Sequence, residues 1–254
     1  MRRPRLETIV VVAPALASVA GFVDAVGYIT LHGLFVAHMS GNTVKFGVYA
    51  GRGDLAVVAP VGFAVVVFVA GIAIGTIAAE VTSRRRHRSV AATVLGVQTA
   101  LIAAFMLYGS TLLDGHEVRG HSLGGFYVLA TLAVLSMGLQ TAALRQLGGR
   151  AISTTYVTGV LTSLTQEATN YAFWLHDREH RDEEHSFLSR VLGLGSRHES
   201  RGRVLLLASV WLAYISGAVL GSYLDGPLEL WALLLPLAVL VLVVLSDLSR
   251  PLVL

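Results

Sequence analysis

The sequence predicts an all-α membrane protein that crosses the bilayer several times, and two observations lead to this fold class. Hydrophobic residues make up 54% of the chain and charged residues only 14%, whereas soluble domains carry about 25% charged residues. The apolar residues also gather in runs of about 20, the length that crosses the hydrocarbon core as a helix. We therefore expect one transmembrane domain over residues 1–254, folded as a polytopic helix bundle.

Complete spans are expected where about 20 or more residues carry few or no charges. Six segments qualify, approximately 8–31, 55–82, 89–110, 123–144, 204–224 and 228–248. The first run continues past Ala15-Leu16-Ala17, a triplet typical of signal-peptide cleavage, so we expect a retained span there. Two further apolar segments, 34–51 and 152–175, are interrupted by polar residues. We expect these two to be re-entrant or broken helices, with seven or eight full spans as the alternative.

The distribution of arginine predicts the orientation, because cytoplasmic loops collect Lys and Arg. If both interrupted segments enter and leave on one side, every arginine except Arg52 and Arg119 lies on the side of the N-terminus. If both segments cross instead, the arginine cluster at 84–88 falls on the opposite side. We therefore expect both termini in the cytoplasm, together with a charged, Arg-rich loop at 176–203.

An internal repeat is indicated by two motifs of the first half that recur in the second. Gly21-Phe22-Val23-Asp24-Ala25 returns as Gly138-Leu139-Gln140-Thr141-Ala142, and Ser40-Gly41 returns as Thr158-Gly159 at nearly the same spacing. We expect repeats at approximately 8–110 and 123–248.

Two GxxxG motifs extend this repeat. Gly71 and Gly75 correspond to Gly217 and Gly221, at a spacing that is larger by the length of the insert 176–203. Because each half then holds three crossings, the second half would be inverted, a design that recurs among secondary transporters. Such glycines let helices approach closely, either within the chain or across a possible homodimer.

Four motifs together resemble a known family. They are GFVDAVGY, FVAHMSGNTVKFG, SMGLQTAALR and TTYVTGVLTSL. The combination resembles the YoaK-like family of small bacterial integral membrane proteins, a domain of unknown function, over roughly 13–245. The resemblance implies a multi-pass protein of the inner (plasma) membrane in contact with the lipid bilayer, and it implies no established activity.

Asp24 is the first candidate for chemistry, because a carboxylate within a span costs roughly 2.5–3.5 kcal/mol on insertion scales. Such groups usually face a cavity or a partner, and a buried carboxyl group can take up and release a proton. We expect Asp24 to bind solute or to relay protons. The alternative is a structural acid that is hydrogen-bonded to the backbone of the first interrupted segment.

Candidates for solute binding share small hydroxyl or amide side chains next to a glycine that can open a helix. The first half supplies Ser40, Gly41, Asn42 and Thr43, and the second half supplies Thr154, Thr155, Thr158 and Gly159. The alternative is that these hydroxyl groups bond to carbonyls of their own helix or hold helices together.

Three further polar residues lie within apolar segments. Gln140 is a candidate to orient solute or to pair with Asp24, and His38 is a candidate proton relay because its charge changes near neutral pH. Lys45 is expected to extend its ammonium group towards the membrane surface.

Several function classes are not supported by the sequence. The chain has no cysteine, which excludes disulfides and thiolate metal sites. It lacks GxxxxGK[ST] and HExxH motifs, and we expect no enzyme activity, no cofactor and no metal site. We also expect no binding to nucleic acid.

The function that the sequence favours is a secondary transporter or permease of a small polar solute, proton-coupled through Asp24. One alternative is a channel or facilitator with the same fold. Another is a non-transporting partner protein that acts through the Arg-rich loop at 176–203.

Overall fold

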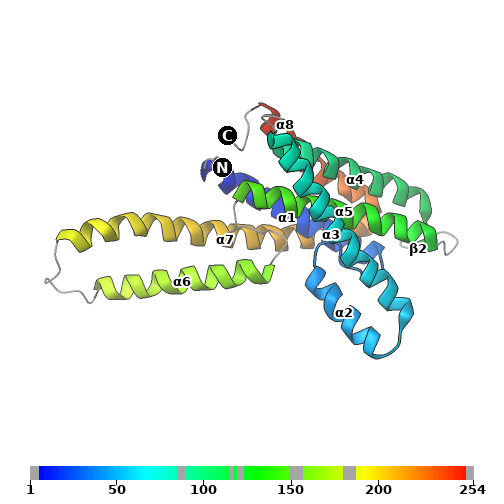
Figure 1. Ribbon diagram of the computed structural model, residues 1–254, viewed down its shortest axis with the longest axis horizontal. Helices are drawn as coiled ribbons and strands as arrows, with labels where there is room; N and C mark the ends of the chain where they lie inside the picture. Colours follow the sequence, from blue (N-terminus) through cyan, green and yellow to red (C-terminus); the bar gives the residue numbers. More distant parts are fainter. Residues whose placement is uncertain are drawn as a thin grey trace.

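The computed structural model describes residues 6–84, 90–114, 117–118, 123–148, 157–179 and 187–249. The helices within these ranges are α1 (Leu6–Thr30), α2 (Met39–Gly51), α3 (Leu55–Arg84), α4 (Val90–Leu112), α5 (Leu123–Gly148), α6 (Val157–Glu179), α7 (Phe187–Leu228), the 3₁₀ helix η3 (Glu229–Leu233) and α8 (Leu234–Ser249). The short strands β1 (Leu113–Asp114) and β2 (Glu117–Val118) pair antiparallel after α4. The predicted all-α membrane bundle is confirmed (Figure 1).

Long apolar helices build the bundle. Five helical stretches of the described chain are long and apolar enough to cross a membrane, and the last of them, Arg201–Ser249, includes part of α7, η3 and α8. The six segments predicted as spans fall on α1, α3, α4, α5, α7 and α8. The number of crossings stays a prediction.

The bundle is organised around α1 and α5, the two most buried of these stretches. In contrast, α3 and α8 leave many large apolar side chains exposed, among them Val66, Val69, Ile77, Leu242 and Leu245. An apolar surface of this extent is typical of a protein that is surrounded by lipid.

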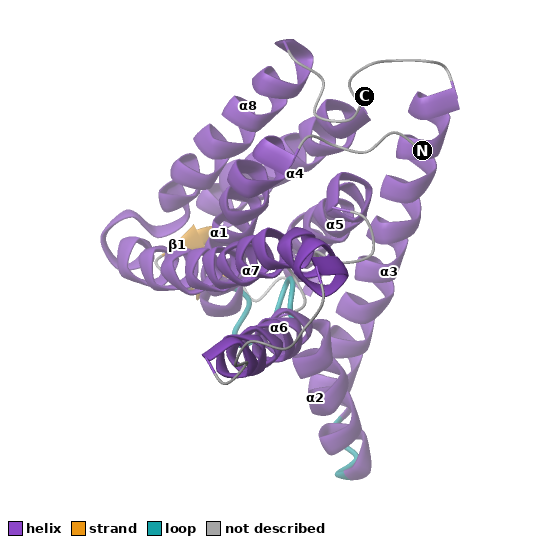
Figure 2. Cartoon of the chain, turned by 90° about the vertical axis from the view of Figure 1, so that its left-hand side faces the viewer, coloured by secondary structure: helices purple, strands orange, loops and turns teal. Residues whose placement is uncertain are grey.

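Two shorter helices form hairpins with longer neighbours. α2 packs against α3, and α6 packs against α7. Both short helices begin beside the bundle and run outward from it (Figure 1), and the rotated view also shows α6 beside α7 (Figure 2). These are the two interrupted segments that we expected to be broken or re-entrant.

The structure differs from the sequence-based expectation at the charged insert. α7 begins at Phe187 and runs for 42 residues, about 63 Å at 1.5 Å per residue, or roughly twice the hydrocarbon thickness. The second part of the predicted loop at 176–203 is therefore helical. A sequence rule that equates dense charge with a loop does not foresee a helix that continues out of the membrane.

Glycines bring α1 against α7. A Cβ atom on Gly21 would overlap the carbonyl oxygen of Tyr214, and one on Gly217 would overlap that of Ser18. One turn further along α7, a Cβ atom on Gly221 would lie 2.8 Å from the carbonyl oxygen of Phe22. The two backbones therefore touch along two turns, which only glycine permits.

The same arrangement joins α3 to α5. A Cβ atom on Gly138 would lie 2.6 Å from the carbonyl oxygen of Phe68, and one on Gly71 would lie 2.7 Å from that of Leu135. Gly75 lies against Leu139 and Ala142 of α5. The glycines of the two repeated motifs, Gly71, Gly75, Gly217 and Gly221, thus pack helices within this chain.

Candidate functional site

Asp24 is buried in α1, with only 5% of its surface exposed, and it accepts three hydrogen bonds. Its Oδ1 accepts from the backbone N–H groups of Val36 at 2.9 Å and Ala37 at 2.8 Å. Its Oδ2 accepts from the hydroxyl group of Tyr214 in α7 at 2.8 Å. The carboxylate therefore joins α1, α7 and the segment that precedes α2.

His38 completes this cluster. Its Nδ1 lies 3.4 Å from Asp24 Oδ2 and 3.1 Å from the hydroxyl oxygen of Tyr214. Its side chain is 29% exposed, whereas that of Asp24 is 6% exposed. Of these two side chains, the imidazole is thus the one that is partly exposed.

The end of α1 explains how the backbone returns to Asp24. The chain turns at His32 and Gly33, whose φ values of 52° and 86° lie in the left-handed region. Gly33 donates its N–H to the carbonyl oxygen of Tyr28, which closes the C-terminal end of the helix. Gly27 lets the returning segment approach, because a Cβ atom there would lie 2.7 Å from the side chain of Val36.

Asn42 fixes the segment from the other side. Its side-chain amide donates to the carbonyl oxygen of Phe35 at 2.7 Å, and its Oδ1 accepts from the N–H of Phe35 at 3.2 Å. Asn42 is completely buried. In this conformation both ends of its amide are engaged by the protein, so its contribution is to hold the segment before α2 in place.

Lys45 has a related position. Its ammonium group donates to the carbonyl oxygen of Gly33 and lies 5.2 Å and 5.3 Å from the ring centroids of Tyr28 and Phe35. The charge is therefore held against two aromatic faces and a backbone carbonyl at the turn after α1. The expectation that Lys45 extends towards the membrane surface stays a prediction.

The helix break lies upstream of the predicted position. Ser40, Gly41, Asn42 and Thr43 all belong to the first turns of α2, and the non-helical segment is 31–38. Thr43 donates its hydroxyl hydrogen to the carbonyl oxygen of Met39 in its own helix at 2.8 Å. Gly41 does not open the helix; it makes room for the ring of Phe35, 3.0 Å from where a Cβ atom would lie.

An ion pair between the two helices of the second hairpin lies next to the start of the apolar part of α7. Arg203 of α7 lies 3.2 Å from Glu167 of α6, next to the start of the apolar part of α7. Tyr214, the partner of Asp24, lies about 16 Å further along α7 at 1.5 Å per residue. Asp24 therefore lies about half of the roughly 30 Å hydrocarbon thickness from the point where the apolar part of α7 begins.

The first residues of α6 reach a similar depth. Val157 lies ten residues before Glu167 on a helix that packs along α7, which corresponds to about 15 Å. Thr158 and Gly159 belong to this first turn, and Thr158 is exposed. Thr154 and Thr155 lie outside the described residues.

Gln140 lies in a separate polar network. Its side-chain N–H donates to the carbonyl oxygen of Leu16 in α1 at 2.7 Å, and its Oε1 accepts from the amide of Gln98 in α4. Both glutamines are completely buried. The expected pairing of Gln140 with Asp24 is wrong, because Gln140 links α1, α4 and α5 at a point two turns along α1 from Asp24.

Two important residues were missed by sequence reasoning. Tyr214 lies in an apolar span 190 residues from Asp24, and no local pattern connects them. Asp247 is 1% exposed, and its Oδ2 accepts from the N–H of Ala92 in the first turn of α4 at 2.7 Å. It therefore caps a helix. A carboxylate in a predicted span was a signal that applied to Asp247 as well as to Asp24.

Comparison with known proteins agrees with this architecture. The profile of a family described as "Protein of unknown function (DUF1275)" matches residues 12–246. The chain belongs to the DUF1275 family. A curated protein, the UPF0700 transmembrane protein YoaK of Bacillus subtilis (strain 168), is 30% identical over 159 residues, which cover 63% of this chain and 67% of YoaK. No solved structure matches the chain. The predicted resemblance to YoaK-like proteins is confirmed, and this DUF1275 member is a multi-pass membrane protein.

Proposed function

We propose that the protein is a secondary transporter of a small polar solute, and that Asp24 couples solute movement to a proton. The observation that carries the proposal is the cluster of Asp24, Tyr214 and His38 near mid-depth, bonded to the backbone at the start of a half-length helix. Buried carboxylates at such a position are typical of proton relays in transporters.

The cluster suggests how a proton would act on the helices. As a carboxylate, Asp24 accepts from Val36, Ala37 and Tyr214 at once. A protonated Asp24 would carry a hydrogen on one oxygen, and that oxygen would be a weaker acceptor. Protonation would therefore loosen the attachment of the segment before α2 to α1 and α7, and would free α2 to move.

The close helix contacts support an inverted repeat. Gly21 of α1 meets Tyr214 of α7, and the corresponding Gly138 of α5 meets Phe68 of α3. The first helix of each proposed half thus packs on the third element of the other half, in matching positions. Two inverted halves that exchange contacts in this way form a hinge suited to alternating access.

The proposed halves are chemically different at the site. Asp24 corresponds to Thr141, which donates to the carbonyl oxygen of Met137 in its own helix at 2.9 Å. Tyr214 corresponds to Phe68, which has no hydroxyl group. The repeat therefore contributes one ionisable cluster, and we propose a single proton-binding position per chain.

The proposal is tested in two steps. Purified protein is first screened against metabolites by thermal shift, since a solute that binds the folded state raises the melting temperature. A stabilising solute is then used for uptake into proteoliposomes with an imposed pH gradient. We expect accumulation by the natural protein and none by Asp24→Asn, while exchange of labelled for unlabelled solute persists in the variant.

The matched control is Asp54→Asn, which removes an exposed carboxylate from the α2–α3 turn. This variant should accumulate solute normally. Accumulation by Asp24→Asn at the natural rate would exclude proton coupling through Asp24. Flux that never exceeds equilibration in the natural protein would instead identify a channel or facilitator.

A further inference from the structure

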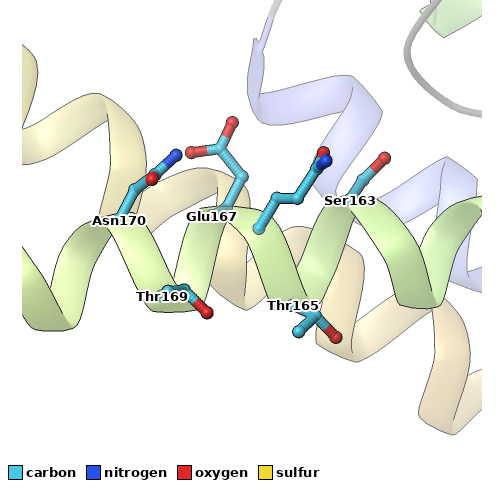
Figure 3. A pocket seen from close by; sticks show the side chains of 6 residues that line it. Ser163, Thr165, Glu167, Thr169 and Asn170 are labelled. Carbon is cyan, nitrogen blue, oxygen red and sulfur yellow. The ribbon is translucent and has the colours of Figure 1, made fainter.

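An open polar pocket lies on the surface of α6 and is separate from the Asp24 cluster; it is called the cavity below. It has a volume of about 420 Å³ and is lined by Ser163, Thr165, Gln166, Glu167, Thr169 and Asn170. Figure 3 shows Ser163, Glu167 and Asn170 on one side of the helix, with Thr165 and Thr169 on the other. We propose that this cavity is the mouth of the solute pathway, and that it takes solutes with hydroxyl or amide groups and no net charge. The proposal rests on the transport function proposed above.

The first argument is the polarity of the exposed face of α6. Side chains that pack towards the core are apolar, namely Val157, Val160 and Leu164. The exposed positions are mostly polar, with Leu161 and Phe173 as apolar exceptions; the polar ones are Thr158, Thr162, Thr165, Gln166, Thr169 and Asn170. A helix that met lipid on this face would show the reverse pattern, as α3 does with Val66 and Val69.

The second argument is depth. Glu167 forms an ion pair with Arg203 where α7 becomes apolar, and Thr158 lies about 14 Å further in along α6. The hydroxyl group of Thr162 donates to the carbonyl oxygen of Thr158 in the same helix at 2.9 Å. Gln166 and Asn170, with larger amides, lie near the ion pair. The exposed polar face thus leads from the membrane boundary towards the depth of Asp24.

The charge of the lining sets the class of solute. Among the described residues that line it, five of six are uncharged, and the carboxylate of Glu167 is paired with Arg203 at 3.2 Å. The cavity therefore offers hydrogen-bond donors and acceptors without a net charge. A volume of about 420 Å³ is within the usual range of roughly 300–1,000 Å³ for small-molecule sites.

The test uses the natural absence of cysteine. Single cysteines are introduced at Thr158 and Ser163, and protein reconstituted in vesicles is treated with water-soluble methanethiosulfonates. The matched control is Leu212→Cys, because Leu212 is 56% exposed on α7. Leu212 lies nine residues from Arg203 and Thr158 lies nine residues from Glu167, so the two positions are equally far from the ion pair along their helices. We expect Thr158→Cys and Ser163→Cys to react and Leu212→Cys to remain unmodified. Equal resistance of Thr158→Cys and Leu212→Cys would overturn the proposed pathway.

The charge of the reagent tests the solute class. After correction for intrinsic reactivity, cationic and anionic reagents should modify Ser163→Cys at rates that differ by no more than about threefold. A cleft with a net charge would instead raise the rate of the oppositely charged reagent by about tenfold or more. A tenfold preference would overturn the uncharged class. Labelling needs no proton gradient, so it tests the pathway separately from proton coupling. Reactive cysteines together with normal uptake by Asp24→Asn would support the pathway and exclude only the coupling role of Asp24.

Discussion

A buried carboxylate is stable in this bundle because its hydrogen bonds come from three parts of the chain. Two donors are backbone N–H groups, of Val36 and Ala37, and the third is the hydroxyl group of Tyr214. Hydrogen bonds to charged groups are worth about 1.5–3 kcal/mol each. These hydrogen bonds therefore let the carboxylate of Asp24 stabilise the folded protein.

Replacing Tyr214 with phenylalanine tests the stabilising part directly. The variant keeps the ring and removes the donor to Asp24 Oδ2, so we expect the free energy of unfolding to fall by about 1.5–3 kcal/mol. Denaturation in detergent measures the change. Tyr223→Phe, which alters a tyrosine that is 74% exposed on the same helix, should leave the stability unchanged. Equal stabilities of the Tyr214→Phe variant and the natural protein would contradict the assigned hydrogen bond.

A second variant tests the attachment of the segment before α2. Asn42→Leu removes both hydrogen bonds to the backbone of Phe35 and leaves two partly buried backbone groups without these partners. We expect a loss of about 2–4 kcal/mol, since each unsatisfied buried group costs about 1–3 kcal/mol. Thr43→Val is the control, because Thr43 is exposed and bonds only within its own helix. A small effect of Asn42→Leu, matching that of Thr43→Val, would show that the segment is held by other contacts.

At the scale of the element, sequence reasoning succeeded where the signal was local and failed where it was not. Apolar runs located the long helices, and the polar interruptions located α2 and α6. The break itself was misplaced, because the turn at His32 and Gly33 lies in a sequence that continues to look apolar. Tyr214 could not be foreseen, since its partner lies on another helix and nothing in the local pattern marks it.

Helix contacts at glycine give a prediction about α1 and α7. Gly217→Ala would place a methyl group on the backbone of Ser18, so the helices must separate, at a cost of about 1–3 kcal/mol or more. Gly202→Ala lies on the same helix with nothing within 4 Å, and should be neutral or stabilising by up to about 1 kcal/mol. Thermal unfolding of the two variants makes the comparison. If Gly217→Ala is as stable as Gly202→Ala, the close packing of α1 on α7 is incorrect.

For the whole molecule, the orientation in the membrane is open to a labelling test. Arg52, in the α2–α3 turn, and Arg84, at the end of α3, are both exposed and lie at opposite ends of one 30-residue helix. With both termini in the cytoplasm, a cysteine at Arg52 should react with an impermeant reagent in intact cells. A cysteine at Arg84 should react only after permeabilisation. The opposite result would invert the proposed topology.

The central claim is that Asp24 binds and releases a proton inside the membrane. Infrared difference spectroscopy of the reconstituted protein measures this directly, because a protonated carboxyl group has a carbonyl band that a carboxylate lacks. On acidification we predict a band that is missing in Asp24→Asn and present in Asp247→Asn, where the replaced acid caps α4. If the spectra of Asp24→Asn and the natural protein are the same, Asp24 does not titrate and the proposed coupling is wrong.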